Sequence, residues 1–167
     1  MTSSLRSVAL ICSALTLGGA SAQSSTAPGG PTVWGGISSE ALIIPTIYGA
    51  LSLPLTRTSP QVSLRGGVQY LAGEVAFGAD LLLGAGDRGL YGGPSGAVIV
   101  GTSPGWMAGA LVGYRNTFSG GHWGYFVEGK ARYLFLRGAA TGHEPNSTPQ
   151  DLAFVSPGLG FGLTYRF

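Results

Sequence analysis

Six charged side chains in this sequence have types and spacing that could form a network of ion pairs. Glu128, Lys130 and Arg132 alternate along one run, so in an extended strand all three would point to the same side. The polar faces of other alternating runs add Arg65, Asp80 and Arg115, with Glu74 and Arg166 as further candidates. Because unpaired charge is costly in a low-dielectric interior, we expect these groups to pair with one another. Two interpretations stay open: a network that fills an enclosed interior, and the lining of a charged, gated pore.

Two other segments contain residue types that could do chemistry. Gly84–Gly89 (GAGDRG) matches the G-x-G-x-x-G pattern, but a dinucleotide site needs a helix directly after it, and LYGGPSG cannot form one. We interpret this segment as a glycine-rich turn. His143, Glu144 and Ser147 are the types found in hydrolytic triads, yet they lie in a proline-containing stretch that we interpret as a solvated loop. The sequence also lacks metal-ligand spacing and a phosphate loop, so we expect no catalytic site, metal or cofactor.

The composition limits the class of protein. The chain has 167 residues, 30 of them glycine, and only 10% are charged, against roughly 25% in an average soluble domain. No apolar run reaches the roughly 18 residues that a membrane-spanning helix needs. A net charge of +2 without a basic stripe argues against a nucleic-acid partner. The length indicates one domain.

The first 22 residues are predicted to be a secretory signal peptide. Arg6 provides the charged start, 8–17 is a short apolar run, and 20–22 (ASA) is a small-residue cleavage site, so we expect cleavage after Ala22. Cys12, the single cysteine, follows a bulky isoleucine, which argues against lipidation. Residues 23–31 (QSSTAPGGP) are predicted to be a flexible lead before a domain that spans 32–167.

From residue 32 onward the chain consists of short alternating runs separated by Gly, Pro, Asn, Asp and Ser, which is typical of all-β sandwiches and barrels. Eight runs are recognised, at 32–38, 45–55, 61–71, 74–83, 92–101, 105–116, 122–136 and 153–167. In the last run one face is bulky and apolar, from Leu159 to Phe167, while the other consists of glycines, Thr164 and Arg166. In a soluble sheet the bulky face would be core, whereas in a membrane barrel it would meet lipid.

Three features favour the barrel. The number of runs is even, and the longest and most polar connection, 137–152, would lie outside the cell if the amino end starts on the periplasmic side. Aromatic residues lie near run ends on the apolar faces, where interfacial girdles would fall: Tyr70, Trp106, Tyr114, Trp123, Tyr125, Tyr133 and Tyr165. We therefore predict an all-β, eight-stranded, antiparallel, up-and-down transmembrane β-barrel. A secreted soluble β-sandwich is the alternative, although it would place more charge on its solvent face.

The ending Tyr165-Arg166-Phe167 resembles the carboxy-terminal signature of bacterial outer-membrane barrels. With the signal peptide and eight glycine-rich runs, the chain resembles the small OmpA/OmpX-type barrels. This resemblance implies a location in the bacterial outer membrane, contact with its lipid, and recognition of Tyr165 and Phe167 by the barrel-assembly machinery. It implies a non-enzymatic, monomeric protein that supports envelope integrity or presents surface loops to partners. A narrow, porin-like channel and an outer-leaflet lipid-modifying enzyme are the alternatives.

Overall fold

Eight strands make up most of the part of the chain that the structure describes. The computed structural model describes residues 30–56, 60–71, 73–84, 86, 88–119, 121–139 and 150–167. The strands are β1 (Thr32–Glu40), β2 (Ile44–Pro54), β3 (Val62–Leu71), β4 (Glu74–Leu83), β5 (Gly89–Val100), β6 (Gly105–Thr117), β7 (Trp123–Ala139) and β8 (Gln150–Arg166). The predicted signal peptide, residues 23–29 of the predicted lead and the loop around His143 lie outside these described residues.

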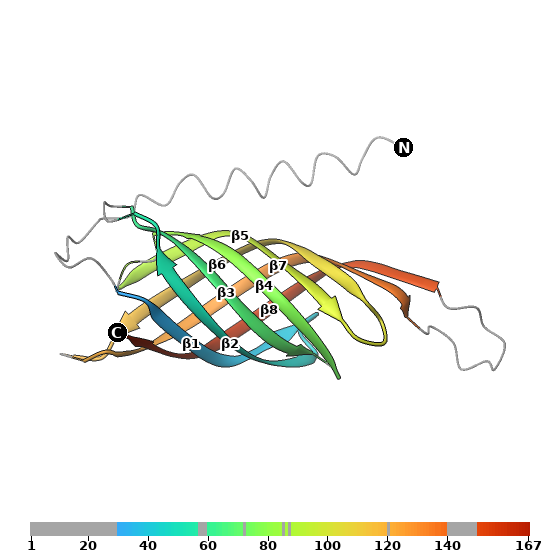
Figure 1. The fold of residues 1–167 in the computed structure, drawn as a ribbon, viewed down its shortest axis with the longest axis horizontal. Helices are drawn as coiled ribbons and strands as arrows, with labels where there is room; N and C mark the ends of the chain where they lie inside the picture. Colours follow the sequence, from blue (N-terminus) through green and yellow to red (C-terminus); the bar gives the residue numbers. More distant parts are fainter. Residues whose placement is uncertain are drawn as a thin grey trace.

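Each strand pairs antiparallel with its neighbours in sequence, and β1 also pairs with β8, so that the sheet closes into a barrel (Figure 1). The closing seam runs from Thr32↔Arg166 to Glu40↔Gly158. The predicted fold class is therefore confirmed: the molecule is a closed, eight-stranded, all-antiparallel β-barrel. Strand β1 contains two adjacent glycines, yet it is paired along its whole length on both sides.

The strands are strongly staggered around the barrel. Following directly paired residues from Trp34 leads through Ala50, Gly67, Gly78, Ala97, Met107, Leu134 and Phe154. Strand β8 pairs with β1 in the register Gly158↔Glu40. Continued along β8, this register places Phe154 opposite position 44, which is ten residues beyond the first residue of the path, Trp34. With a rise of about 3.3 Å per residue and strands about 4.8 Å apart, this stagger corresponds to a tilt of about 40°.

The interior of the barrel is filled by side chains. One buried apolar cluster lies towards the end with the C terminus and comprises Trp34, Tyr48, Leu82, Tyr91, Leu111 and Phe126. A second lies towards the other end and comprises Leu71, Ala76, Ala97, Ile99, Met107 and Leu134. Inward glycines make room for these rings: a Cβ on Gly162 would lie 2.8 Å from Phe126 Cζ, and one on Gly113 would lie 2.6 Å from the Tyr91 ring.

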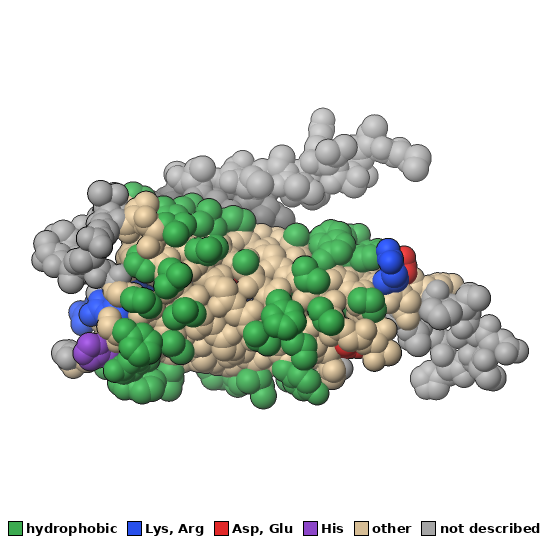
Figure 2. Space-filling view, in the orientation of Figure 1, with side chains coloured by type: hydrophobic (Ala, Val, Ile, Leu, Met, Phe, Trp, Pro, Cys, Tyr) green, Lys and Arg blue, Asp and Glu red, His purple; other side chains and the backbone are tan. Residues whose placement is uncertain are grey.

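The outer wall carries the large apolar side chains. Ile47, Val155, Leu159 and Phe161 are 58–67% exposed, and apolar side chains cover much of the visible surface (Figure 2). Residues alternate between this wall and the interior because successive side chains of a strand point to opposite faces. Strand β5 places Tyr91, Ser95, Ala97 and Ile99 inside and Leu90, Val98 and Val100 outside.

Candidate functional site: the charged interior of the barrel

Four charged residues meet in the middle of the barrel. Arg65 of β3 and Asp80 of β4 are directly paired, and Arg65 Nη2 lies 2.8 Å from Asp80 Oδ2. The same guanidinium crosses the interior to β7, where Nη1 contacts Glu128 Oε1 and Nη2 lies 3.3 Å from Glu128 Oε2. Lys130 Nζ lies 3.6 Å from Glu128 Oε2. Strands β3 and β7 are therefore linked through the interior by ion pairs.

The Glu128 carboxylate is the centre of this cluster. Its side chain is fully buried, and the Tyr91 hydroxyl of β5 donates a hydrogen bond of 2.7 Å to Oε1. The carboxylate thus has partners from β3, β5 and its own strand. A buried ion is tolerated when its charge is matched and its lone pairs accept hydrogen bonds, and Glu128 meets both conditions.

A second cluster lies next to the first, further from the C terminus. Arg132 Nη2 contacts Glu40 Oε1, and the Ser156 hydroxyl donates a 3.2 Å hydrogen bond to Glu40 Oε2. Arg132 Nη2 also lies 3.5 Å from Gln69 Oε1. Glu40 is not among the predicted charges, because the predicted first run ends at residue 38, two residues before the observed end of β1. Extending the inward alternation of Trp34 and Ser38 by one step would have found it.

Two cations lie over the Trp34 ring. The guanidinium carbons of Arg65 and Arg115 lie 4.8 and 5.2 Å from its centroid. Arg115 also donates a hydrogen bond to the carbonyl of Gly86, in the turn between β4 and β5. In the same way, Lys130 Nζ lies 4.8 Å from the centroid of the Tyr48 ring. The aromatic side chains of the apolar cluster towards the C terminus therefore serve as further partners for the interior cations.

The further candidates Glu74 and Arg166 lie at the barrel ends, away from the central cluster. The Glu74 carboxylate accepts hydrogen bonds of 3.0 and 3.1 Å from the backbone amides of Thr102 and Ser103, and so holds the β5–β6 turn. At the opposite end the Arg166 backbone amide donates to the carbonyl of His122. The prediction that Glu74 joins the central charges is wrong, because its position at the start of β4 places it at the rim.

Little free space remains between the charged side chains. The cavity beside them has a volume of about 10 Å³, which suits about one water molecule. Its polar lining comes from Tyr48, Arg65, Gln69, Asp80, Lys130 and Arg132. In the described part of the chain, the Tyr48 hydroxyl and Arg132 Nε are buried without a hydrogen-bond partner. This arrangement can bind a water molecule, but it offers no room for a substrate.

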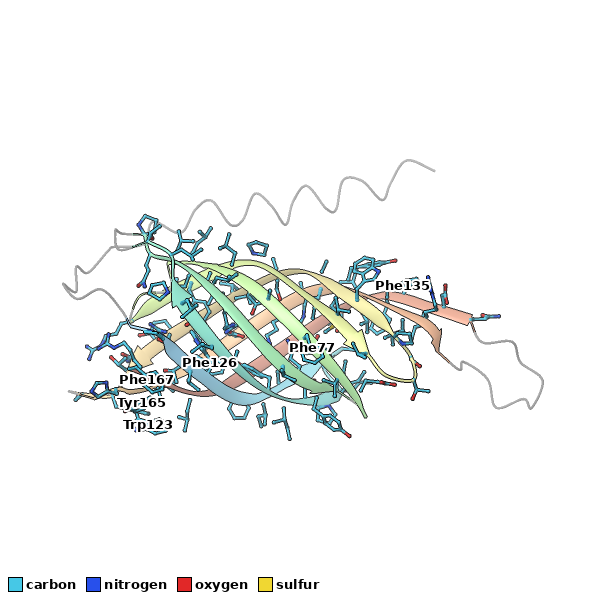
Figure 3. The ribbon with its side chains drawn as sticks, in the orientation of Figure 1. Phe77, Trp123, Phe126, Phe135, Tyr165 and Phe167 are labelled. Atoms are coloured by element: carbon cyan, nitrogen blue, oxygen red, sulfur yellow. The ribbon has the colours of Figure 1, made fainter. Side chains whose placement is uncertain are left out.

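Six of the seven predicted interfacial aromatics, all except Tyr165, lie on the outer wall with side chains 36–55% exposed. Tyr70, Trp106 and Tyr133 lie at the end with the β5–β6 turn, where Trp106 packs 5.6 Å from Tyr133. Tyr114, Trp123 and Tyr125 lie at the other end. There, Trp123 and Phe167 pack against Tyr165 at 5.0 and 5.1 Å (Figure 3).

Of the glycine motif, the described residues Gly84, Gly86 and Arg88 connect β4 to β5, and its last residue, Gly89, begins strand β5. Within the described ranges, no group of three His, Cys, Asp or Glu side chains could hold a metal ion, and no helix is long and apolar enough to cross a membrane. Comparisons with protein-family models, curated proteins and solved structures found no match to this chain.

Proposed function

We propose that this protein is an integral, non-enzymatic component of a bacterial outer membrane, in which the barrel crosses the bilayer and supports the envelope or presents its external connections to partners. The observation that carries the proposal is the inverted distribution of side chains. Charged groups such as Arg65, Glu128 and Arg132 lie inside, while the exposed wall is apolar. This distribution is the reverse of that in a soluble sheet, and it suits a lipid environment.

The spacing of the aromatic residues supports a membrane location. Trp106 and Tyr114 are eight residues apart in β6, and Tyr125 and Tyr133 are eight residues apart in β7. Eight residues span about 27 Å along a strand, or about 21 Å along the axis at a tilt of about 40°. This height is close to the apolar band of about 25 Å that outer-membrane barrels present between their aromatic girdles.

The alternatives have less support. A secreted sandwich needs two packed sheets, whereas this chain forms one closed sheet and would leave side chains such as Ile47 and Val155 in water. A lipid-modifying enzyme would depend on the residues around His143, which the described ranges do not include. A narrow channel is the second candidate, since polar groups line the interior, but the filled cross-section favours a closed barrel.

Membrane fractionation combined with gel mobility tests the proposal. The full chain is expressed in a Gram-negative host, outer and inner membranes are separated, and samples are run boiled and unboiled. We expect the protein in the outer-membrane fraction, with a mobility shift on boiling, because a closed barrel resists detergent until heated. Recovery of the folded protein in the soluble fraction would refute the membrane location.

A further inference from the structure

The small cavity beside the charged side chains is lined by polar groups that lack hydrogen-bond partners. Tyr48 and Arg132 both line it, and in the described part of the chain the Tyr48 hydroxyl and Arg132 Nε are buried without a partner. The two residues are only 7% and 1% exposed, so bulk solvent does not satisfy these groups. Leaving both unpaired would destabilise the barrel. They therefore indicate that a polar molecule occupies the cavity.

The lining requires an occupant that both accepts and donates hydrogen bonds. Arg132 Nε is a donor only, so its partner must be an acceptor. Asp80 also lines the cavity, and its Oδ2 oxygen is paired with Arg65 at 2.8 Å. Among the described residues this leaves the Oδ1 oxygen of Asp80 as an acceptor that needs a donor. The Tyr48 hydroxyl can take either role. Water is the smallest molecule that satisfies all three groups.

Charge and size favour a water molecule over an ion. Three cations line the cavity, and each has an acidic partner: Arg65 with Asp80, Lys130 with Glu128, and Arg132 with Glu40. Three positive charges are thus matched by three negative ones, and no net charge is left for a bound ion to neutralise. The volume of about 10 Å³ also suits a single water molecule.

We propose that one ordered water molecule occupies this cavity and joins the two ion-pair clusters into a single network. It accepts hydrogen bonds from Arg132 Nε and from the Tyr48 hydroxyl, and it donates one to Asp80 Oδ1. Arg132 is paired with Glu40 in one cluster. Asp80 is paired with Arg65 in the other. Because the site lies inside the closed barrel, it exists whether or not the outer wall meets lipid.

Removing the Tyr48 hydroxyl distinguishes a filled cavity from an empty one by the sign of the effect. With the water present, Tyr48→Phe loses a hydrogen bond, so we expect the urea midpoint of the full chain in detergent micelles to fall by about 0.5 M. In an empty cavity the same change would remove a buried, unpaired hydroxyl, and the midpoint would rise. Tyr91→Phe is the matched control, because the Tyr91 hydroxyl donates to Glu128 and its loss lowers the midpoint in either case.

Filling the cavity should abolish the effect of Tyr48→Phe. Gly78 lines the cavity from the inner face of β4, and a Cβ there would lie 3.1 Å from Gln69 Nε2. In the Gly78→Ala background we expect Tyr48→Phe to leave the midpoint unchanged or to raise it. Gly160→Ala is the matched control: its Cβ would lie equally close, 3.1 Å, to Ser38 Cβ, but Gly160 does not line the cavity. In that background Tyr48→Phe should still lower the midpoint.

An unchanged or raised midpoint for Tyr48→Phe in the wild-type background would overturn the proposal, and so would an equal fall in the Gly78→Ala background. Titrations in sodium chloride and in sodium gluconate test for a halide. Equal midpoints are expected, whereas a midpoint that chloride raises in wild type but not in Gly78→Ala would show a bound anion in place of the water. If the variants do not fold, crystals of the wild-type chain decide: electron density for one water in the cavity is expected, and an empty cavity would refute the site.

Discussion

Glu128 is the residue on which the interior charge balance depends most. Its buried carboxylate is the shared partner of Arg65, Lys130 and Tyr91, which come from three strands. We predict that Glu128→Ala lowers the free energy of unfolding by about 3–5 kcal/mol, because it leaves buried cations without their counter-charge. Urea-induced unfolding in detergent micelles, followed by tryptophan fluorescence, measures this change.

A control variant and a double-mutant cycle make this prediction specific. Asp151 is also an acid, but it is exposed and accepts one hydrogen bond from Gly138, so Asp151→Ala should change stability by less than about 1 kcal/mol. Combining Glu128→Ala with Arg65→Met should give a coupling free energy of about 1–3 kcal/mol. Additive effects of the two substitutions would show that the contact does not stabilise the barrel.

The alternation of Glu128, Lys130 and Arg132 is enough to predict that they share a face. The sequence did not reveal that Arg65 crosses from β3 to Glu128, because that contact depends on the stagger of strands far apart in the chain. Aromatic partners such as Tyr91 were missed for the same reason. Tyr91 also lies one residue before the predicted run at 92–101, so the sequence assigned it to neither face of a strand.

At the scale of elements, the β1–β2 turn is the most strained connection in the described part of the chain. Ala41 and Leu42 have φ angles of 50° and 62°, and the Ile43 amide donates to the Glu40 carbonyl. This geometry is that of a type I′ turn, which strongly favours Asn-Gly. We predict that the double variant Ala41→Asn/Leu42→Gly raises the free energy of unfolding by about 1 kcal/mol, because it relieves left-handed strain.

The same urea titration tests the turn. Ile43→Gly is the matched control, since Ile43 is exposed but does not have a positive φ, and it should not stabilise the barrel. A loss of stability in the double variant would mean that the contacts of this turn with β8 outweigh its strain. Those contacts are the hydrogen bonds from Ala41 to the Ser156 hydroxyl and from Leu42 to the Pro157 carbonyl.

Strand positions followed well from the alternation of side chains, with ends no more than three residues from those predicted. The largest differences are at β5, β7 and β8. Strand β5 begins at Gly89, inside a segment that the sequence indicated was a turn. Strands β7 and β8 extend past the other strands at one end, up to the pair Ala139↔Gln150, after a register shift beyond Leu136 (Figure 1). The sequence did not predict this extension because its residues are polar. Only the pairing between β7 and β8 maintains it.

At the scale of the whole molecule, the charged layer lies between two apolar clusters inside the barrel. Trp34 and Phe126 belong to the cluster on one side, and Met107 and Leu134 to the cluster on the other. An eight-stranded barrel is only wide enough for its own side chains to fill. The three layers together therefore block the axis, and removing one of them leaves two in place.

This layering distinguishes a filled barrel from a gated pore. If the ion pair between Arg65 and Glu128 were a gate, Glu128→Ala would raise conductance. In the filled barrel, wild type and Glu128→Ala both stay silent in planar bilayers, because the clusters around Trp34 and Met107 still exclude water. Each preparation is first shown to be folded by its mobility shift on boiling, so that silence reports a closed barrel. Steady single-channel currents from wild type, or currents that appear with Glu128→Ala, would establish a charged pore in place of the filled interior.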